Sequence, residues 1–118
     1  MIVRIVTDSA SDLTPTEAEA LGVDVVPLSI RFGEEVFLDQ EELDVEEFYR
    51  RMASSEDLPQ TAAPAPGAFQ EVFRRRFAEG ADAIVCINLS SGLSATMESS
   101  ELAAREVDGD VGLSTAAR

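Results

Sequence analysis

Short β-branched segments alternate with capped helices along most of this chain, and this alternation constrains the fold more than any other feature. Residues 2–7, 23–30 and 83–89 are apolar runs of strand length. Helices are predicted over residues 14–21, 44–53, 66–79 and 93–107. Strands separated by helices favour an α/β domain with a mostly parallel sheet flanked by helices.

Local signals define several boundaries of these elements. Thr14 and Glu17 form a capping-box pattern around a proline, and Gly22 is suited to end the helix that follows. A small hairpin is predicted to turn at Gly33. Residues 55–67 carry three prolines and are predicted to be irregular. Residues 112–118 are expected to form a frayed tail.

The composition excludes several classes of function. The net charge is −14, all nine basic residues are arginine, and histidine and lysine are absent. Such a chain is a poor partner for nucleic acid and for anionic membrane surfaces. Neither a Ser-His-Asp nor a Ser-Lys arrangement can be built from it. With a single cysteine, Cys86, in an apolar run, we expect a buried thiol, no metal site and no cofactor.

Targeting signals give one further expectation. The sequence has no signal peptide and no apolar stretch long enough to span a bilayer, so we expect a cytoplasmic protein without an integral membrane segment.

The segment Ser90–Thr96 is the strongest candidate for a binding site. It follows a predicted strand and opens a helix, so hydroxyls and free backbone N–H groups converge beside the positive end of a helix dipole. This arrangement suits a carboxylate or a phosphate. Ordinary capping of the helix by Ser91 or Ser94 is the alternative interpretation.

Two further polar segments follow predicted strands or precede predicted helices. Thr61 can present its hydroxyl to the same anion, although a plain proline-rich connection also explains its surroundings. Asp8 and Ser9 belong to a polar loop that could hold a hard metal ion or act in acid–base chemistry. Bracing of the loop by bonds from these side chains to the backbone is the interpretation that we favour.

These segments together resemble the DegV family. Residues 5–13, Ile-Val-Thr-Asp-Ser-Ala-Ser-Asp-Leu, are similar to the family's opening strand and TDS-x-x-DL motif. Thr61-Ala62-Ala63-Pro64 falls where the family has T-S-Q-P, and residues 87–100 resemble its S-S-x-L-S-G-T helix opening. The resemblance extends to about Val107, with the motifs in the same order. In this chain Ala62, Ala63 and Ala95 replace the family's serine, glutamine and glycine.

The resemblance implies a function. DegV proteins are bacterial carriers that bind a long-chain fatty acid and serve as the binding subunit of a fatty acid kinase, whose separate catalytic subunit phosphorylates the carboxylate. By resemblance, Thr61 and Ser94 bind the carboxylate, and Ser91, Ala95 and Thr96 support it. The chain is then a non-catalytic lipid-binding protein.

The resemblance also gives a domain scheme. We expect a DegV-like amino-terminal domain over residues 1–107, a truncated tail over 108–118, and no second domain, which in the family supplies part of the lipid cavity. Two other functions stay open. One is a small α/β hydrolase or phosphatase that uses Asp8 as its nucleophile, and the other is an interaction module that keeps the fold without a ligand.

Overall fold

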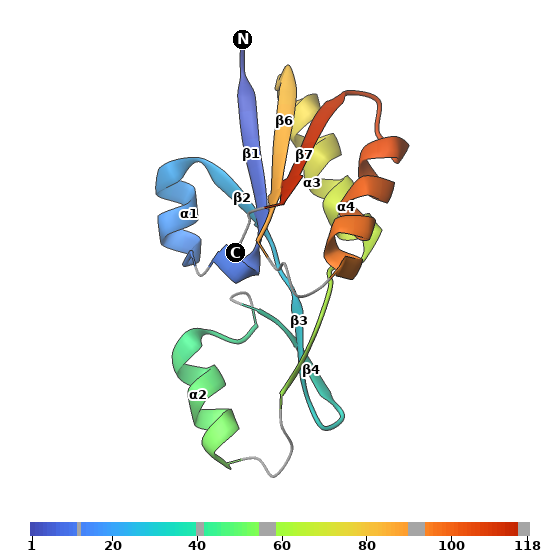
Figure 1. The fold of residues 1–118 in the computed structure, drawn as a ribbon. Coiled ribbons are helices and arrows are strands. Elements are labelled where there is room, and N and C mark those ends of the chain that lie inside the picture. The colour runs from blue at the N-terminus through green and yellow to red at the C-terminus, as the bar shows by residue number, and fades with distance from the viewer. Residues whose placement is uncertain (12, 40–41, 55–58, 90–93, 116–118) are drawn as a thin grey trace.

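The computed structural model describes residues 1–11, 13–39, 42–54, 59–89 and 94–115. Its elements, in chain order, are β1 (Val3–Asp8), η1 (Ser9–Ser11), α1 (Pro15–Leu21), β2 (Val23–Val26), β3 (Ser29–Phe32), β4 (Glu35–Leu38), α2 (Val45–Ser54), β5 (Gln60–Ala62), α3 (Pro66–Ala78), β6 (Ala83–Asn88), α4 (Ser94–Glu106) and β7 (Asp110–Thr115). Figure 1 shows these elements in two stacked parts, a larger one with both termini and a smaller one with α2.

The larger part is a parallel sheet with the strand order β2-β1-β6-β7, which confirms the predicted α/β class. The chain moves outward from β1 to β2 at one edge and from β6 to β7 at the other. Because crossovers between parallel strands are right-handed, α1 and α4 lie on opposite sides of the strands (Figure 1). The strand order therefore reverses between β1 and β6.

Strand β7 was not expected from the sequence. It pairs with β6 from Asp110 to Thr115, so the frayed tail predicted from residue 112 is wrong for residues 112–115. The segment has few large apolar residues and contains Gly112, which weakens any local strand signal. Pairing with β6 and the packing of Val111 and Leu113 against the core hold it in place.

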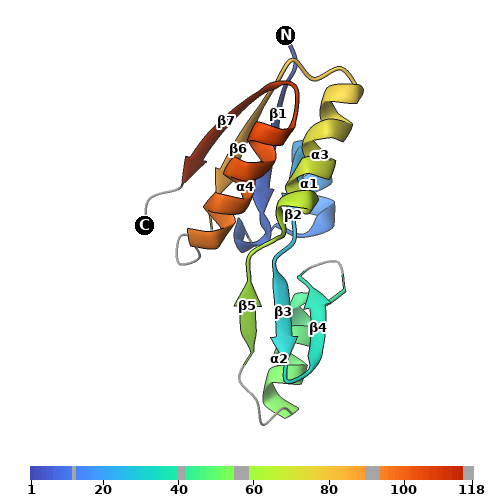
Figure 2. The ribbon, with the colours of Figure 1, turned by 90° about the vertical axis from the view of Figure 1, so that its right-hand side faces the viewer.

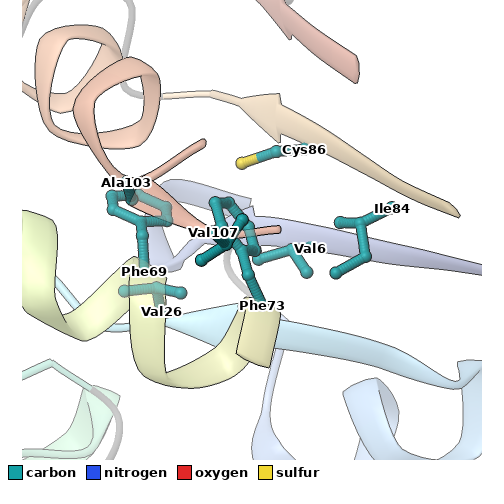
Figure 3. Close-up of a cluster of buried hydrophobic side chains, with 8 residues drawn as sticks. All are labelled: Val6, Val26, Phe69, Phe73, Ile84, Cys86, Ala103 and Val107. Atoms are coloured by element: carbon teal, nitrogen blue, oxygen red, sulfur yellow. The ribbon is translucent and has the colours of Figure 1, made fainter. Parts of the chain in front are cut away.

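The main core lies between the parallel sheet and helices α3 and α4. It consists of eight buried side chains that interlock as Figure 3 shows: Val6, Val26, Phe69, Phe73, Ile84, Cys86, Ala103 and Val107. Successive residues of a strand point to opposite faces, so the residues that alternate with the core residues of β1 and β6 face away from α3 and α4. Three residues on that opposite face are partly open to solvent: Val3 is 48% exposed, Ile5 41% and Val85 37%.

The first helix begins and ends as predicted. The Thr14 side chain accepts from the backbone N–H of Glu17, and the Glu17 side chain accepts from the N–H of Thr14. Gly22 ends the helix in the left-handed region, with φ of 70°, where a residue with a Cβ is strained.

The smaller part is an antiparallel sheet with the order β4-β3-β5, which α2 covers. The predicted strand over residues 23–30 is in fact two strands in different sheets, because Pro27 has no N–H to donate and interrupts the ladder. The β3–β4 hairpin turns at Gly33 as predicted. The segment predicted to be irregular contains β5, which pairs with β3.

A second, small core holds the smaller part together. Ile30, Phe32 and Leu43 are buried there, with Phe37 and Phe48 packed against them. The Phe32 and Phe48 rings lie 5.8 Å apart, and the Arg51 guanidinium lies 4.5 Å above the Phe37 ring. The two parts thus have separate cores, which accounts for the elongated extents of 49 × 28 × 26 Å.

Charged side chains join the edge of the parallel sheet to α3. The Arg76 Nε donates to Asp24 Oδ2 at 2.7 Å, and Arg4 reaches the same oxygen at 3.5 Å. Burial acts to raise the pKa of Asp24, but the bonds and charges of Arg76 and Arg4 outweigh it, so the pKa lies below its usual value. This stabilisation is present above the unfolded-state pKa of about 3.9 and is lost as pH falls through the folded-state pKa.

We expect Asp24→Asn to lower the free energy of unfolding at pH 7 by about 2 kcal/mol, between the values typical of exposed and buried ion pairs. The difference from the wild-type protein should begin to shrink as pH falls below about 4, where the unfolded state takes up a proton, and should vanish only below the lowered folded-state pKa, where Asp24 is protonated in both states. Urea denaturation at several pH values measures it, with Asp108→Asn at an exposed position as the control. A difference independent of pH would contradict this account.

Two glycines, Gly109 and Gly67, form a matched pair of positions for testing how an added methyl group affects packing. A Cβ at Gly109 would lie 2.6 Å from the Phe77 ring, whereas a Cβ at Gly67 in α3 has nothing within 4 Å. We expect Gly109→Ala to lower the free energy of unfolding by about 1–2 kcal/mol through overpacking. Gly67→Ala should raise it by about 0.5–1 kcal/mol, because alanine favours the helix. Urea denaturation of both variants checks the opposite signs.

Candidate ligand site at the carboxyl edge of the parallel sheet

The strand order reverses between β1 and β6, and open α/β sheets bind ligands outside the carboxyl ends of strands at such a point. The turn after β1 and the start of α4 both lie at this edge (Figure 1). The smaller part of the molecule adjoins the same edge. The polar residues singled out from the sequence therefore come from three segments around one junction.

Asp8 is the last residue of β1 and is fully buried. The β1–β6 ladder ends with Thr7 opposite Ile87. Beyond that pair, Asp8 Oδ2 accepts the backbone N–H of Leu89 at 2.9 Å, and Oδ1 accepts the N–H of Ala10 at 3.0 Å. The carboxylate therefore continues the link between β1 and β6 past the point where backbone pairing stops.

Ser9 forms a similar link on the other side of β1. The β1–β2 ladder ends with Asp8 opposite Val26, and the following Pro27 cannot donate. Ser9 is 1% exposed, and its Oγ accepts the N–H of Leu28 at 2.9 Å. Neighbouring residues in one turn thus bond to the chain leaving β6 and to the chain leaving β2.

The start of α4 contains most of the predicted carboxylate-binding residues. Ser94 is the first residue of this helix, but its side chain and all of Ser91 lie outside the described residues. Ala95 is exposed. Thr96 is fully buried, and its Oγ1 makes no hydrogen bond to any part of the chain that the structure describes. A buried hydroxyl without a partner is costly, and it is often found where a ligand or a water completes the bonding.

A polar contact behind the start of α4 was missed in the sequence. The Asn88 Nδ2, at the end of β6, donates to Ser100 Oγ at 3.0 Å and contacts Met97 Sδ at 3.1 Å. Ser100 Oγ in turn donates to the carbonyl of Met97 at 2.9 Å. These bonds tie the first two turns of α4 to β6. An asparagine inside an otherwise apolar strand was the signal that could have revealed the contact.

Thr61 lies in a different setting from the one predicted. It is not in a loop but in β5, the edge strand of the small sheet, opposite Ile30, and its side chain is exposed. Figure 2 shows the carboxyl end of β5 and the start of α4 at the same junction between the two sheets. The convergence of the Thr61 and Ser94 hydroxyls on one ligand stays a prediction.

Cys86 faces the main core from β6. It is fully buried, as expected from the sequence. Burial raises the pKa of its thiol to about 12, and the charge of Asp8 adds to the effect. The thiol is therefore protonated at neutral pH and has no nucleophilic character.

A hollow of about 400 Å³ opens at the neck between the two sheets. Its apolar lining comes from β2, β4, α3 and the connections that precede β3 and α3, and includes Val25, Pro27, Leu38, Pro64 and Val72. Glu71 and Arg75 of α3 also line it. Within the described ranges, no helix is both long enough and apolar enough to cross a membrane.

Comparisons with known proteins agree with this architecture. A family profile described as "Uncharacterised protein, DegV family" matches residues 2–113. A DegV domain-containing protein of Halalkalibacterium halodurans is 44% identical over 107 residues, which are 91% of this chain and 38% of that protein. The chain therefore spans about two fifths of the length of this relative.

Two solved structures are similar in fold. One is described as the fatty acid binding of a DegV family protein from Thermus thermophilus, with a TM-score of 0.81 and 36% identity over 96% of this chain and 40% of that one. The other is the B3 protein of Streptococcus pneumoniae fatty acid kinase, loaded with linoleic acid, with a TM-score of 0.73 and 26% identity over 96% and 41%. From the family profile and these similarities, the chain belongs to the DegV family.

Proposed function

We propose that this chain binds a long-chain fatty acid, with the carboxylate held at the start of α4. The observation that carries the proposal is the fully buried Thr96 hydroxyl, which makes no bond within the described residues and lies in the first turn of a 13-residue helix. The fatty acids named for the solved relatives supply the ligand class.

The proposed carboxylate site follows from helix electrostatics. The first backbone N–H groups of a helix have no partner inside it, and the dipole gives this end a partial positive charge. In the proposed arrangement, Ser94 and Thr61 donate hydroxyl bonds to the carboxylate. Ser91, Thr96 and the N–H groups near Ala95 support it. Bonds to a charged group contribute about 1.5–3 kcal/mol each.

The apolar hollow at the neck is the proposed start of the tail site. Each buried methylene contributes about 0.8 kcal/mol, so the tail provides much of the binding free energy. The relative from H. halodurans is considerably longer than this chain. A polypeptide of residues 1–118 alone is expected to bind more weakly than the full-length relative, because it offers fewer apolar contacts to the tail.

We further propose that the chain presents the carboxylate to a separate kinase subunit and does no chemistry itself. The fully buried carboxylate of Asp8 accepts backbone N–H bonds on both oxygens, which suits a structural role better than nucleophilic attack. Formation of an acyl phosphate, only when a fatty acid kinase catalytic subunit and ATP are added, would support this step. Hydrolysis of a generic phosphate ester by the chain alone would contradict it.

Removing a hydroxyl group that binds the carboxylate should weaken fatty-acid binding. We expect Ser94→Ala and Thr61→Ala each to raise the Kd for a fluorescent long-chain fatty acid by about tenfold or more, from the loss of one charge-assisted bond. Ser99→Ala, later on α4, is the matched control and should leave the Kd unchanged. Native mass spectrometry of the purified protein should show a bound mass matching a fatty acid. Binding that is insensitive to both variants would refute the carboxylate site, and no binding at all would favour a fold-only interaction module.

Thr96→Val separates a ligand-binding role from a packing role. The valine has nearly the same shape, so the free energy of unfolding should stay equal or rise by up to about 1 kcal/mol, because an unpaired buried hydroxyl is removed. The affinity for the fatty acid should nevertheless fall. In the control Ser100→Ala, which breaks the bond from Asn88, the free energy of unfolding should fall by about 1 kcal/mol. Urea denaturation and the same titration measure both quantities; a strongly destabilised Thr96→Val would contradict the assignment.

A further inference from the structure

The two sheets are joined at a narrow neck. The chain passes from the parallel sheet to the small sheet through Pro27 and Leu28, and it returns from β5 to α3 through residues 63–65. The sheets have separate cores. Their relative placement therefore depends on the contacts at the neck.

Two hydrogen bonds hold the backbone of Leu28 at this neck. Its N–H donates to Ser9 Oγ at 2.9 Å, and its carbonyl accepts from the N–H of Asp39, after β4, at 2.9 Å. Leu28 itself is buried, and it immediately precedes β3, the central strand of the small sheet. Since β3 pairs with β5, where Ile30 lies opposite Thr61, the hydrogen bond from Leu28 links Ser9 to the sheet that holds Thr61.

Asp8, the residue before Ser9, bonds to the chain at the end of β6. Its bond to the Leu89 N–H fixes the chain where it leaves β6, five residues before α4 begins at Ser94. Asn88 fixes the same strand end to α4 through Ser100. The start of α4 is thus placed relative to β1 through the Asp8 carboxylate.

We propose that Asp8 and Ser9 are positioning residues that set the Thr61-bearing strand and the start of α4 at the correct separation for one ligand. The inference rests on the proposed fatty-acid site and deepens it. Neither residue touches the ligand: Ser9 acts through Leu28, β3 and β5, and Asp8 acts through Leu89. Sites whose groups must converge lose much of their effect when their support shifts by about 1 Å.

The first experiment needs no ligand. Residual dipolar couplings of backbone amides report the orientation of β3–β5 relative to the parallel sheet. We expect Ser9→Ala, which removes only a hydroxyl, to change this orientation or to broaden its distribution. Thr14→Ala, which removes the α1 capping box and costs a comparable free energy of unfolding, should leave the orientation unchanged.

The second experiment is a set of double-mutant cycles on the Kd for the fluorescent fatty acid. Ser9→Ala should weaken binding by about tenfold in the wild-type background and by less than about threefold in the Thr61→Ala background. Asp8→Asn should show the same non-additivity with Ser94→Ala. Thr14→Ala should be additive with both ligand-site variants, because general destabilisation does not act through one hydroxyl.

The outcomes separate this inference from the proposed function. An unchanged orientation in Ser9→Ala, or additive Ser9→Ala and Thr61→Ala effects, overturns the positioning role even when the chain binds fatty acid. If the wild-type chain binds no fatty acid, the proposed function fails, and a changed orientation still supports the placement of the small sheet by Ser9. Ser9→Ala decides the question even where Asp8→Asn does not fold.

Discussion

Pairing of β1 with both β2 and β6 is the constraint on which the rest of the structure depends. It makes β1 the strand at which the sheet order reverses, and it brings the turn after β1 beside the segment that opens α4. The alternation along β1 then assigns roles to its residues. Val6 faces the core with α3 and α4, whereas Val3 and Ile5 face the less covered side.

Several polar groups at the end of this sheet are buried, and bonds to the backbone explain two of them, Asp8 and Ser9. Asp8 and Ser9 accept N–H groups that the ending ladders leave without a strand partner, so their burial is compensated. The Asn88 Nδ2 instead donates to the side-chain hydroxyl of Ser100. The Thr96 hydroxyl has no partner among the described residues, and the same is true of the buried Thr7 Oγ1 and Asn88 Oδ1. Thr96 is distinguished as a candidate binding group by its place in the first turn of α4, where the helix dipole favours an anion.

The net charge of −14 repels an anionic ligand, but this repulsion acts mainly at long range. Exposed charges are screened over about 8 Å at physiological ionic strength, whereas donors at a helix start act at contact distance. The acidic surface is therefore compatible with the proposed carboxylate site, although it disfavours the approach of an anion from a distance. Local geometry at the junction, and not total charge, determines whether the site works.

The sequence by itself determined the fold class, the helices and the end of α1, because strand-length apolar runs, capping boxes and Gly22 act within a few residues. It also indicated the polar turn at Asp8 and the segment at Ser94. Tertiary structure decided the rest. β7 and β5 are strands because they pair with β6 and β3, and Pro27 divides one apolar run between two sheets. Asp8 also bonds to Leu89, 81 residues away, and Ser9 bonds to Leu28, 19 residues away, and no local pattern encodes a bond between residues so far apart in the chain.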